Sequence, residues 1–182
     1  MAQNITIKFA LEEDDVAYFR KIFRNARKHA AELEEKEIVG SVQALIERVR
    51  KTRKTPHFVR EAVRVLEDLL NMLQDEDYDL PKAPRGEVLG ALAYFANPHD
   101  LIPDQIPGLG FLDDAIMIKI LEDEFRQELW GYRQFVKFRS GAEQRPWTQI
   151  AKSRLPERLA ERRRKIRQDV DRKKKERRFV WW

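Results

Sequence analysis

The stretch ALAYFANPHDLIPDQIPGLGFLDDAIMIKIL, residues 91–121, joins a loop rich in proline and glycine to an apolar helix. Proline fixes φ and removes a backbone donor, and glycine reaches conformations closed to other residues, so this loop has a defined shape. The residues that interrupt regular structure are Pro98, Pro103, Pro107, Gly108 and Gly110. Residues 115–121 are apolar on nearly every side, which is typical of a helix at the centre of a bundle. The stretch therefore predicts an all-α core built around one buried helix.

Apolar residues at helical spacing extend this prediction along the rest of the chain. The helices that we expect cover about 12–33, 38–49, 55–73, 85–96 and 113–139, followed by a last helix from about Pro146. Thr55 followed by Pro56 predicts an N-cap with proline at the first helical position of the third helix. The predicted fold class is all-α, a compact helical bundle of about five helices with a short N-terminal extended arm and a basic C-terminal helix.

The N-terminal arm is residues 4–9, in which Ile5, Ile7 and Phe9 alternate with polar residues. The rest of the chain shows no second strand pattern, so a strand here would have no partner within the chain. The arm either lies on the helices or pairs with the same arm of a second copy, which would make a homodimer.

Composition narrows the class of protein. A chain of 182 residues with 42% apolar residues has enough apolar surface for a single core. No apolar run approaches the roughly 20 residues that cross a bilayer, so we expect no transmembrane segment. The absence of cysteine excludes disulfides, thiolate catalysis and cysteine metal sites, and residues 1–9 do not resemble a secretory signal. We therefore expect a cytoplasmic protein, or one bound peripherally at the inner membrane face.

Positive charge is concentrated near the C-terminus. The net charge of the chain is +5, but residues 152–178 hold 14 basic and five acidic residues, a local +9, and the rest of the chain sums to −4. This asymmetry predicts two parts, a helical domain over residues 1–140 with its core motif at 88–122, and a basic helical tail over residues 141–182.

The sequence leaves three interpretations of the basic tail open. Clustered cations bind nucleic acid or the ribosome through counterion release, or they meet anionic lipids at the inner membrane face while terminal aromatic residues lie at headgroup depth. The third interpretation is a solvated helix whose apolar stripe packs on the rest of the chain or on another copy. The residues expected to contact an anionic surface are Arg162, Arg163, Arg164, Lys165, Arg172, Lys173, Lys174, Lys175, Arg177, Arg178, Trp181 and Trp182.

The segment NPHDLIPDQIPGLGFLDDAIMI, preceded by LAYF, resembles the YkvA-like bacterial domain of unknown function. That domain has a Pro-x-Asp-Leu-Ile-Pro-Asp loop, a Gly-x-Gly-x-x-Asp-Asp turn and an apolar helix, and all three are present within residues 88–122. The resemblance implies an all-helical module with no established activity. Some relatives carry membrane segments, and this sequence differs from them in having none.

Four carboxylates fall inside this motif, Asp100, Asp104, Asp113 and Asp114, with His99 beside them. Converging carboxylates suit Mg²⁺ or Ca²⁺, and such an ion can activate water for hydrolysis. Alternatively, Asp113 and Asp114 stabilise a helix start, and Asp100 and Asp104 accept hydrogen bonds from backbone N–H groups within the loop. No His-x-x-x-His or Glu-x-x-His pair accompanies the carboxylates, which favours the structural role.

Standard catalytic and nucleotide-binding motifs are absent from the sequence. There is neither a Gly-x-Ser-x-Gly elbow nor a phosphate loop ending in Gly-Lys-Ser/Thr, and we expect no cofactor. The predicted function is a non-enzymatic helical binding or adaptor module whose basic tail contacts an anionic surface. The alternative is a divalent-metal-dependent hydrolase that uses the aspartate cluster.

Overall fold

The computed structural model describes residues 10–53, 55–96, 110–143 and 153–180, and these residues form seven α-helices, two short 3-10 helices and no strand. The α-helices are α1 (Glu13–His29), α2 (Glu35–Lys51), α3 (His57–Gln74), α4 (Lys82–Leu92), α5 (Leu112–Glu124), α6 (Arg126–Glu143) and α8 (Leu155–Val180), and the 3-10 helices are η1 (Ala30–Glu32) and η2 (Ala93–Ala96). The predicted all-α class is confirmed, with more helices than the expected five or so.

Acidic residues begin the first two helices. The backbone N–H of Glu12 donates to the Asp15 carboxylate at 3.0 Å, and the N–H of Glu34 donates to Glu37 at the same distance, which closes a capping box at each helix start. The predicted cap at Thr55 is wrong. Pro56 is the N-cap of α3, and the Thr55 hydroxyl instead donates to backbone carbonyls at the end of α2, because the chain turns there before α3 begins.

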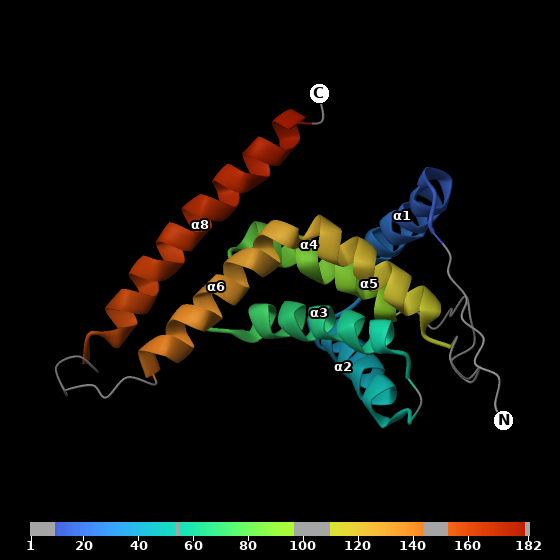
Figure 1. The fold of residues 1–182 in the computed structure, drawn as a ribbon, viewed down its shortest axis with the longest axis horizontal. Coiled ribbons are helices and arrows are strands. Elements are labelled where there is room, and N and C mark those ends of the chain that lie inside the picture. Colours follow the sequence, from blue (N-terminus) through green and yellow to red (C-terminus); the bar gives the residue numbers. More distant parts are fainter. Residues whose placement is uncertain (1–9, 54, 97–109, 144–152, 181–182) are drawn as a thin grey trace.

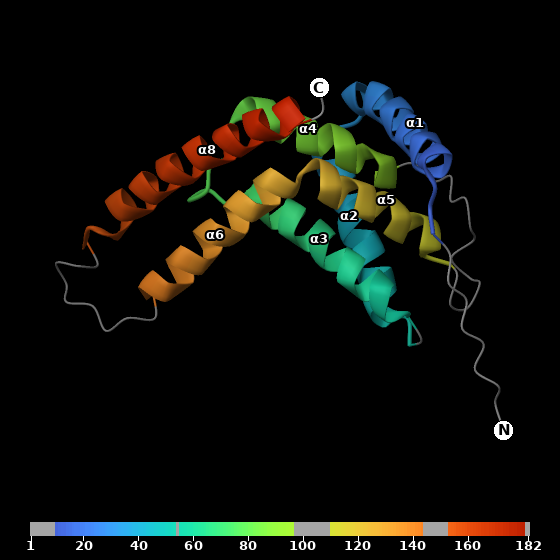
Figure 2. The ribbon, with the colours of Figure 1, turned by 45° about the horizontal axis from the view of Figure 1, so that its top comes forward.

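The core is formed by α2, α3 and α5, with α1 and α4 packed over one end (Figure 1). The α3 helix contributes the largest buried face, which consists of Val59, Val63, Val65, Leu66, Leu69, Leu70, Met72 and Leu73. The predicted central helix is α5, in which Met117, Ile118 and Leu121 are at most 1% exposed. At the other end of the molecule α8 lies beside α6 and runs in the opposite direction (Figure 2).

The single helix expected over residues 113–139 is two helices. Phe125 separates α5 from α6, and its φ of −95° and ψ of 17° turn the chain between them. The Phe125 side chain is 3% exposed, and the Arg27 guanidinium lies 5.8 Å from the centre of its ring. Neither proline nor glycine marks this position, so no local signal in the sequence predicts the break.

Two sequence predictions fall outside the described residues. They are the extended arm at 4–9, with its proposed role in a homodimer, and the loop that holds Pro98, His99, Asp100, Pro103, Asp104 and Gly108. Among the helices that the structure describes, none is both long enough and apolar enough to cross a membrane.

Candidate functional site

The two described aspartates of the motif lie in the first turn of α5, as the sequence predicted. Asp113 and Asp114 are 3% and 9% exposed, both interact with other parts of the chain, and they follow the N-cap residue Phe111. Carboxylates at this end of a helix interact favourably with its dipole. Gly110, which precedes the helix, is buried. This placement is the one that the structural interpretation of the motif requires.

The metal interpretation depends on residues outside this description. Asp100, Asp104 and His99 all belong to the segment that is not described. Within residues 10–53, 55–96, 110–143 and 153–180 no group of three or more metal-ligating side chains comes together. The metal site therefore stays a prediction about the motif loop.

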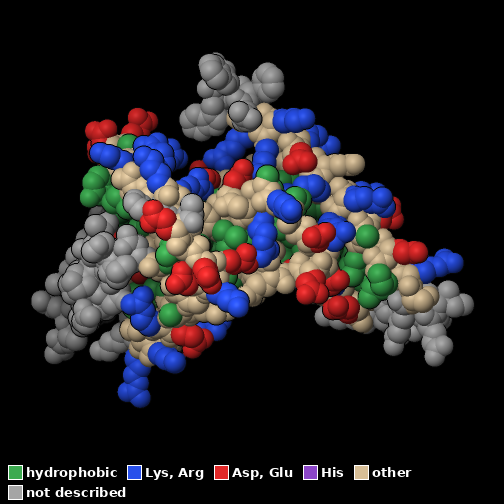
Figure 3. Space-filling view, turned by 180° about the vertical axis from the view of Figure 1, so that it is seen from behind, with side chains coloured by type: hydrophobic (Ala, Val, Ile, Leu, Met, Phe, Trp, Pro, Cys, Tyr) green, Lys and Arg blue, Asp and Glu red, His purple; other side chains and the backbone are tan. Residues whose placement is uncertain are grey.

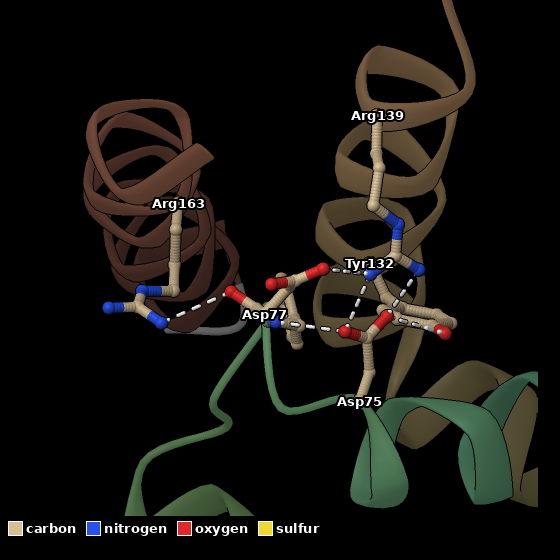
Figure 4. A network of polar contacts seen from close by, with 6 residues as sticks. Asp75, Asp77, Tyr132, Arg139 and Arg163 are labelled. Atoms are coloured by element: carbon tan, nitrogen blue, oxygen red, sulfur yellow. Dashed lines mark hydrogen bonds and ion pairs between the residues drawn. The ribbon is translucent and has the colours of Figure 1, made fainter. Parts of the chain in front are cut away.

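A second set of polar residues lies where α3 ends, and sequence analysis did not identify it. Asp75 accepts two hydrogen bonds from the Arg139 guanidinium, at 2.8 and 2.7 Å, and one from the Tyr132 hydroxyl at 3.2 Å (Figure 4). The backbone N–H of Tyr78 donates to the same carboxylate at 3.0 Å. Burial raises the pKa of Asp75, but the hydrogen bonds from Arg139 and Tyr78 and the charge of Arg139 outweigh it, and the pKa lies below its ordinary value of 3.8.

The same turn contacts the C-terminal helix. Arg163 of α8 donates to the backbone carbonyl of Asp77 at 3.1 Å (Figure 4). Its guanidinium also lies 3.5 Å from the Asp79 carboxylate. Asp79 has a φ of 46°, a left-handed conformation that aspartate tolerates better than most residues. The turn after α3 therefore links α6 through Arg139 and α8 through Arg163.

The interface between α6 and α8 contains a buried carboxylate. Glu128 of α6 is 1% exposed, and it lies 2.6 Å from an Arg167 nitrogen and 2.7 Å from the Lys174 ammonium of α8. Arg167 also donates to the Tyr78 hydroxyl at 3.1 Å. Burial raises the pKa of Tyr78 to about 12. Arg177 extends the row with an ion pair of 2.8 Å to Asp123.

Apolar packing accompanies these ion pairs. Leu159, Ile166 and Val170 of α8 are buried, so the thin stripe seen in the sequence packs on the rest of this chain. Gly131 of α6 lies against α8, and a Cβ there would come within 2.7 Å of a Val170 methyl carbon. The apolar stripe of the tail therefore packs on α6 of the same chain.

The structure divides the predicted anion-contacting residues into two groups. The group that contacts α5, α6 or the turn after α3 is Arg162, Arg163, Lys173, Lys174 and Arg177. The exposed group is Arg164, Lys165, Arg172 and Lys175. The Arg178 side chain, Trp181 and Trp182 lie outside the description. The tail's excess positive charge is therefore directed in large part at carboxylates and aromatic rings of its own chain.

Glu128 and Gly131 carried a signal that sequence analysis missed. Glu128 is three residues after Phe125 and four before Tyr132, so it shares the apolar face of its helix. A carboxylate on such a face needs a cation from another element, and a glycine in the middle of a helical pattern marks a close approach.

Comparison with known proteins supports the predicted family. Residues 85–120 match the family described as "Protein of unknown function (DUF1232)", and they contain most of α4, all of η2 and much of α5. The "Uncharacterized membrane protein YkvA" of Bacillus subtilis (strain 168) is 31% identical over 90 residues, which cover 47% of this chain and 79% of that protein. No solved structure matches the chain. The family is one of unknown function, and the motif match together with the relative shows that this chain belongs to the YkvA-like DUF1232 family.

Proposed function

We propose that this protein is a non-enzymatic adaptor that contacts an anionic membrane surface through the exposed basic side of α8. The observation that carries this proposal is the placement of Arg164, Lys165, Arg172 and Lys175 on exposed positions of a helix whose opposite side is held against α6. Arg164 and Lys175 are 11 positions apart, so these side chains span roughly 16 Å of helix, enough to meet several lipid headgroups.

The local charges make this contact weak and sensitive to salt. Lys165 pairs with Glu161 at 2.7 Å, and Arg172 pairs with Asp169 at 2.7 Å. These pairs are exposed, and exposed pairs contribute little, so the cations stay available to a surface with a higher density of negative charge. Figure 3 shows basic side chains along the edge that α8 forms, with acidic ones among them. A basic residue near an anionic bilayer contributes about 1 kcal/mol, so four such residues support a reversible contact.

A lipid surface is favoured over nucleic acid by the relative's description. The Bacillus subtilis protein is called a membrane protein, although its role is uncharacterized. In our proposal this chain contacts the membrane at its surface and does not cross it. Trp181 and Trp182 follow α8 in the sequence, and tryptophan is suited to the depth of the lipid headgroups. Inner-face attachment would fit both the tail and the predicted cytoplasmic location.

Vesicle sedimentation with the full chain tests the proposal. We expect binding to vesicles that contain phosphatidylglycerol, little binding to pure phosphatidylcholine, and loss of binding as salt rises. Changing Arg164, Lys165, Arg172 and Lys175 together to Gln should abolish binding. The matched control changes Lys36, Lys51, Arg53 and Arg60, four exposed basic residues on α2, α3 and the link between them, to Gln.

Both variants lower the net charge from +5 to +1, so only the position of the lost charge differs between them. Equal loss of binding in the two variants would contradict a contact made by α8. If the chain binds duplex DNA more strongly than vesicles at the same salt concentration, the partner of α8 is nucleic acid and not lipid.

A further inference from the structure

A pocket of about 320 Å³ lies between the C-terminal half of α6 and the start of α8. Its wall includes Gln134, Lys137 and Phe138 from α6 and Arg158 and Arg162 from α8. Three of these side chains are cationic, and none of the described residues that line the pocket is acidic. The other described pockets mix both signs of charge, as where Glu61 and Asp68 line the same pocket as Arg64.

Two guanidinium groups share one aromatic ring in this pocket. Arg158 and Arg162 lie one helical turn apart, and their guanidinium carbons are 5.8 and 5.6 Å from the centre of the Phe138 ring. A ring face attracts each cation, but two cations on one ring repel each other. The two cations therefore add to the positive potential on one wall of the pocket.

Arg162 differs from its neighbours on the inner side of α8. Arg163, Arg167, Lys174 and Arg177 each reach an oxygen of the turn after α3, of α5 or of α6. Arg162 has no ion pair among the described residues, and its Nε is buried without a hydrogen-bond acceptor. A guanidinium that lacks a carboxylate partner can take the oxygens of an anionic ligand instead, through its terminal nitrogens.

We infer that this pocket binds a phosphate group, either the phosphate of an anionic lipid headgroup or free phosphate. Arginine presents planar paired donors that match phosphate oxygens, Lys137 adds a third cation, and Gln134 adds an amide donor. The volume is at the lower end of the range for ligand pockets and is large enough for a phosphate group. The lipid source rests on the proposed function, whereas binding of free phosphate does not.

The test follows the Nε–H signal of Arg162 by NMR while inorganic phosphate is added to the full chain at low salt. We expect this signal to move and to reach saturation, because phosphate bound at the terminal nitrogens of the same guanidinium changes its electronic environment. Arg162→Lys identifies the signal by removing it. Lys137→Gln, a change at an exposed position that leaves the fold intact, should weaken phosphate binding about fivefold or more. Arg164→Gln, on the outer side of the same helix, should leave phosphate affinity unchanged.

Three results would contradict phosphate binding in this pocket. They are the lack of a saturable shift of the Arg162 signal, an equal shift of the Arg164 signal, or an equal loss of phosphate affinity in Lys137→Gln and Arg164→Gln. Such results would leave the vesicle contact of α8 untouched, so failure of the pocket and failure of the proposed function are separate.

Vesicles then distinguish the two sources of phosphate. With phosphatidic acid at about 30 mol% in phosphatidylcholine, Lys137→Gln should weaken binding more than Arg164→Gln does if the ligand is a lipid headgroup. An unchanged vesicle affinity in Lys137→Gln, beside weakened phosphate binding, assigns the pocket to free phosphate.

Discussion

Glu128 of α6 and Arg167 of α8 form an ion pair of 2.6 Å in which the carboxylate side chain is 1% exposed and the guanidinium side chain 19%. Thirty-nine residues separate them in the chain. Lys174 reaches the same carboxylate from the next turns of α8, so one buried negative charge meets two cations. A buried carboxylate of this kind is stable only when it is paired, which makes α8 part of the environment that α6 requires.

Removing the charge of Glu128 should destabilise the protein. In Glu128→Gln, Arg167 and Lys174 lose their common partner while the side chain keeps its size, and we expect the free energy of unfolding to fall by about 2–4 kcal/mol. Urea denaturation at neutral pH measures the change. Glu161→Gln is the control, since Glu161 forms an exposed pair with Lys165 and its loss should leave the urea midpoint in place. Equal midpoints for the two variants would show that the buried pair contributes nothing.

Adding a methyl group at Gly131 should push α8 away from α6. The new Cβ would lie 2.7 Å from a Val170 carbon, 3.1 Å from the Tyr78 hydroxyl and 3.2 Å from an Ile166 carbon. Alanine favours helix by about 1 kcal/mol over glycine, but this overlap outweighs that gain, and we expect a net loss of about 1–3 kcal/mol. Gly40→Ala, in α2, meets nothing within 4 Å and should raise the melting temperature. A rise in both variants would refute the close approach.

The Asp75 carboxylate should make stability depend on pH at the acidic end. Its pKa is lower in the folded chain than the ordinary value of 3.8, so the unfolded chain binds more protons near that pH. Stability from this group is therefore complete above about pH 4 to 5 and is lost as pH falls through the folded pKa. Asp75→Asn should lower stability at neutral pH by about 1–3 kcal/mol and flatten the acid limb of the stability profile. If the slope of stability against pH is unchanged in Asp75→Asn, the acid sensitivity comes from another group. The control is Asp77→Asn, which changes a more exposed carboxylate.

Shortening the chain tests the domain division at residue 140, which stays a prediction. A chain that ends at Glu143 lacks α8, and with it the contacts of Arg167 to Glu128 and Tyr78 and the packing on Gly131. We expect the shortened chain to keep its helical circular dichroism and to melt at a lower temperature than the full chain. An identical melting temperature would show that residues 1–143 fold without help from the tail.

Local spacing explains why so much of the fold was accessible from the sequence. The apolar positions of α2 and α3 repeat at three and four residues, and the motif placed Asp113 and Asp114 in the first turn of α5. Local signals also failed in two places. The pair of Thr55 and Pro56 predicted an N-cap for α3. The Thr55 hydroxyl instead donates hydrogen bonds to carbonyls at the end of α2. Phe125 carried no breaking residue, yet it separates two helices.

By itself the sequence determined the all-α class, the family motif and the contrast between an acidic body and a basic tail, because these depend on residue type and spacing alone. Only the tertiary structure decided which cations of the tail turn inward. Arg167 meets Tyr78 across 89 residues and Arg177 meets Asp123 across 54, and such pairs form only where packing brings two helices together. The buried stripe of α8 sets which side of the helix faces water. The same packing therefore determines which cations stay exposed and which of them line the pocket beside Phe138.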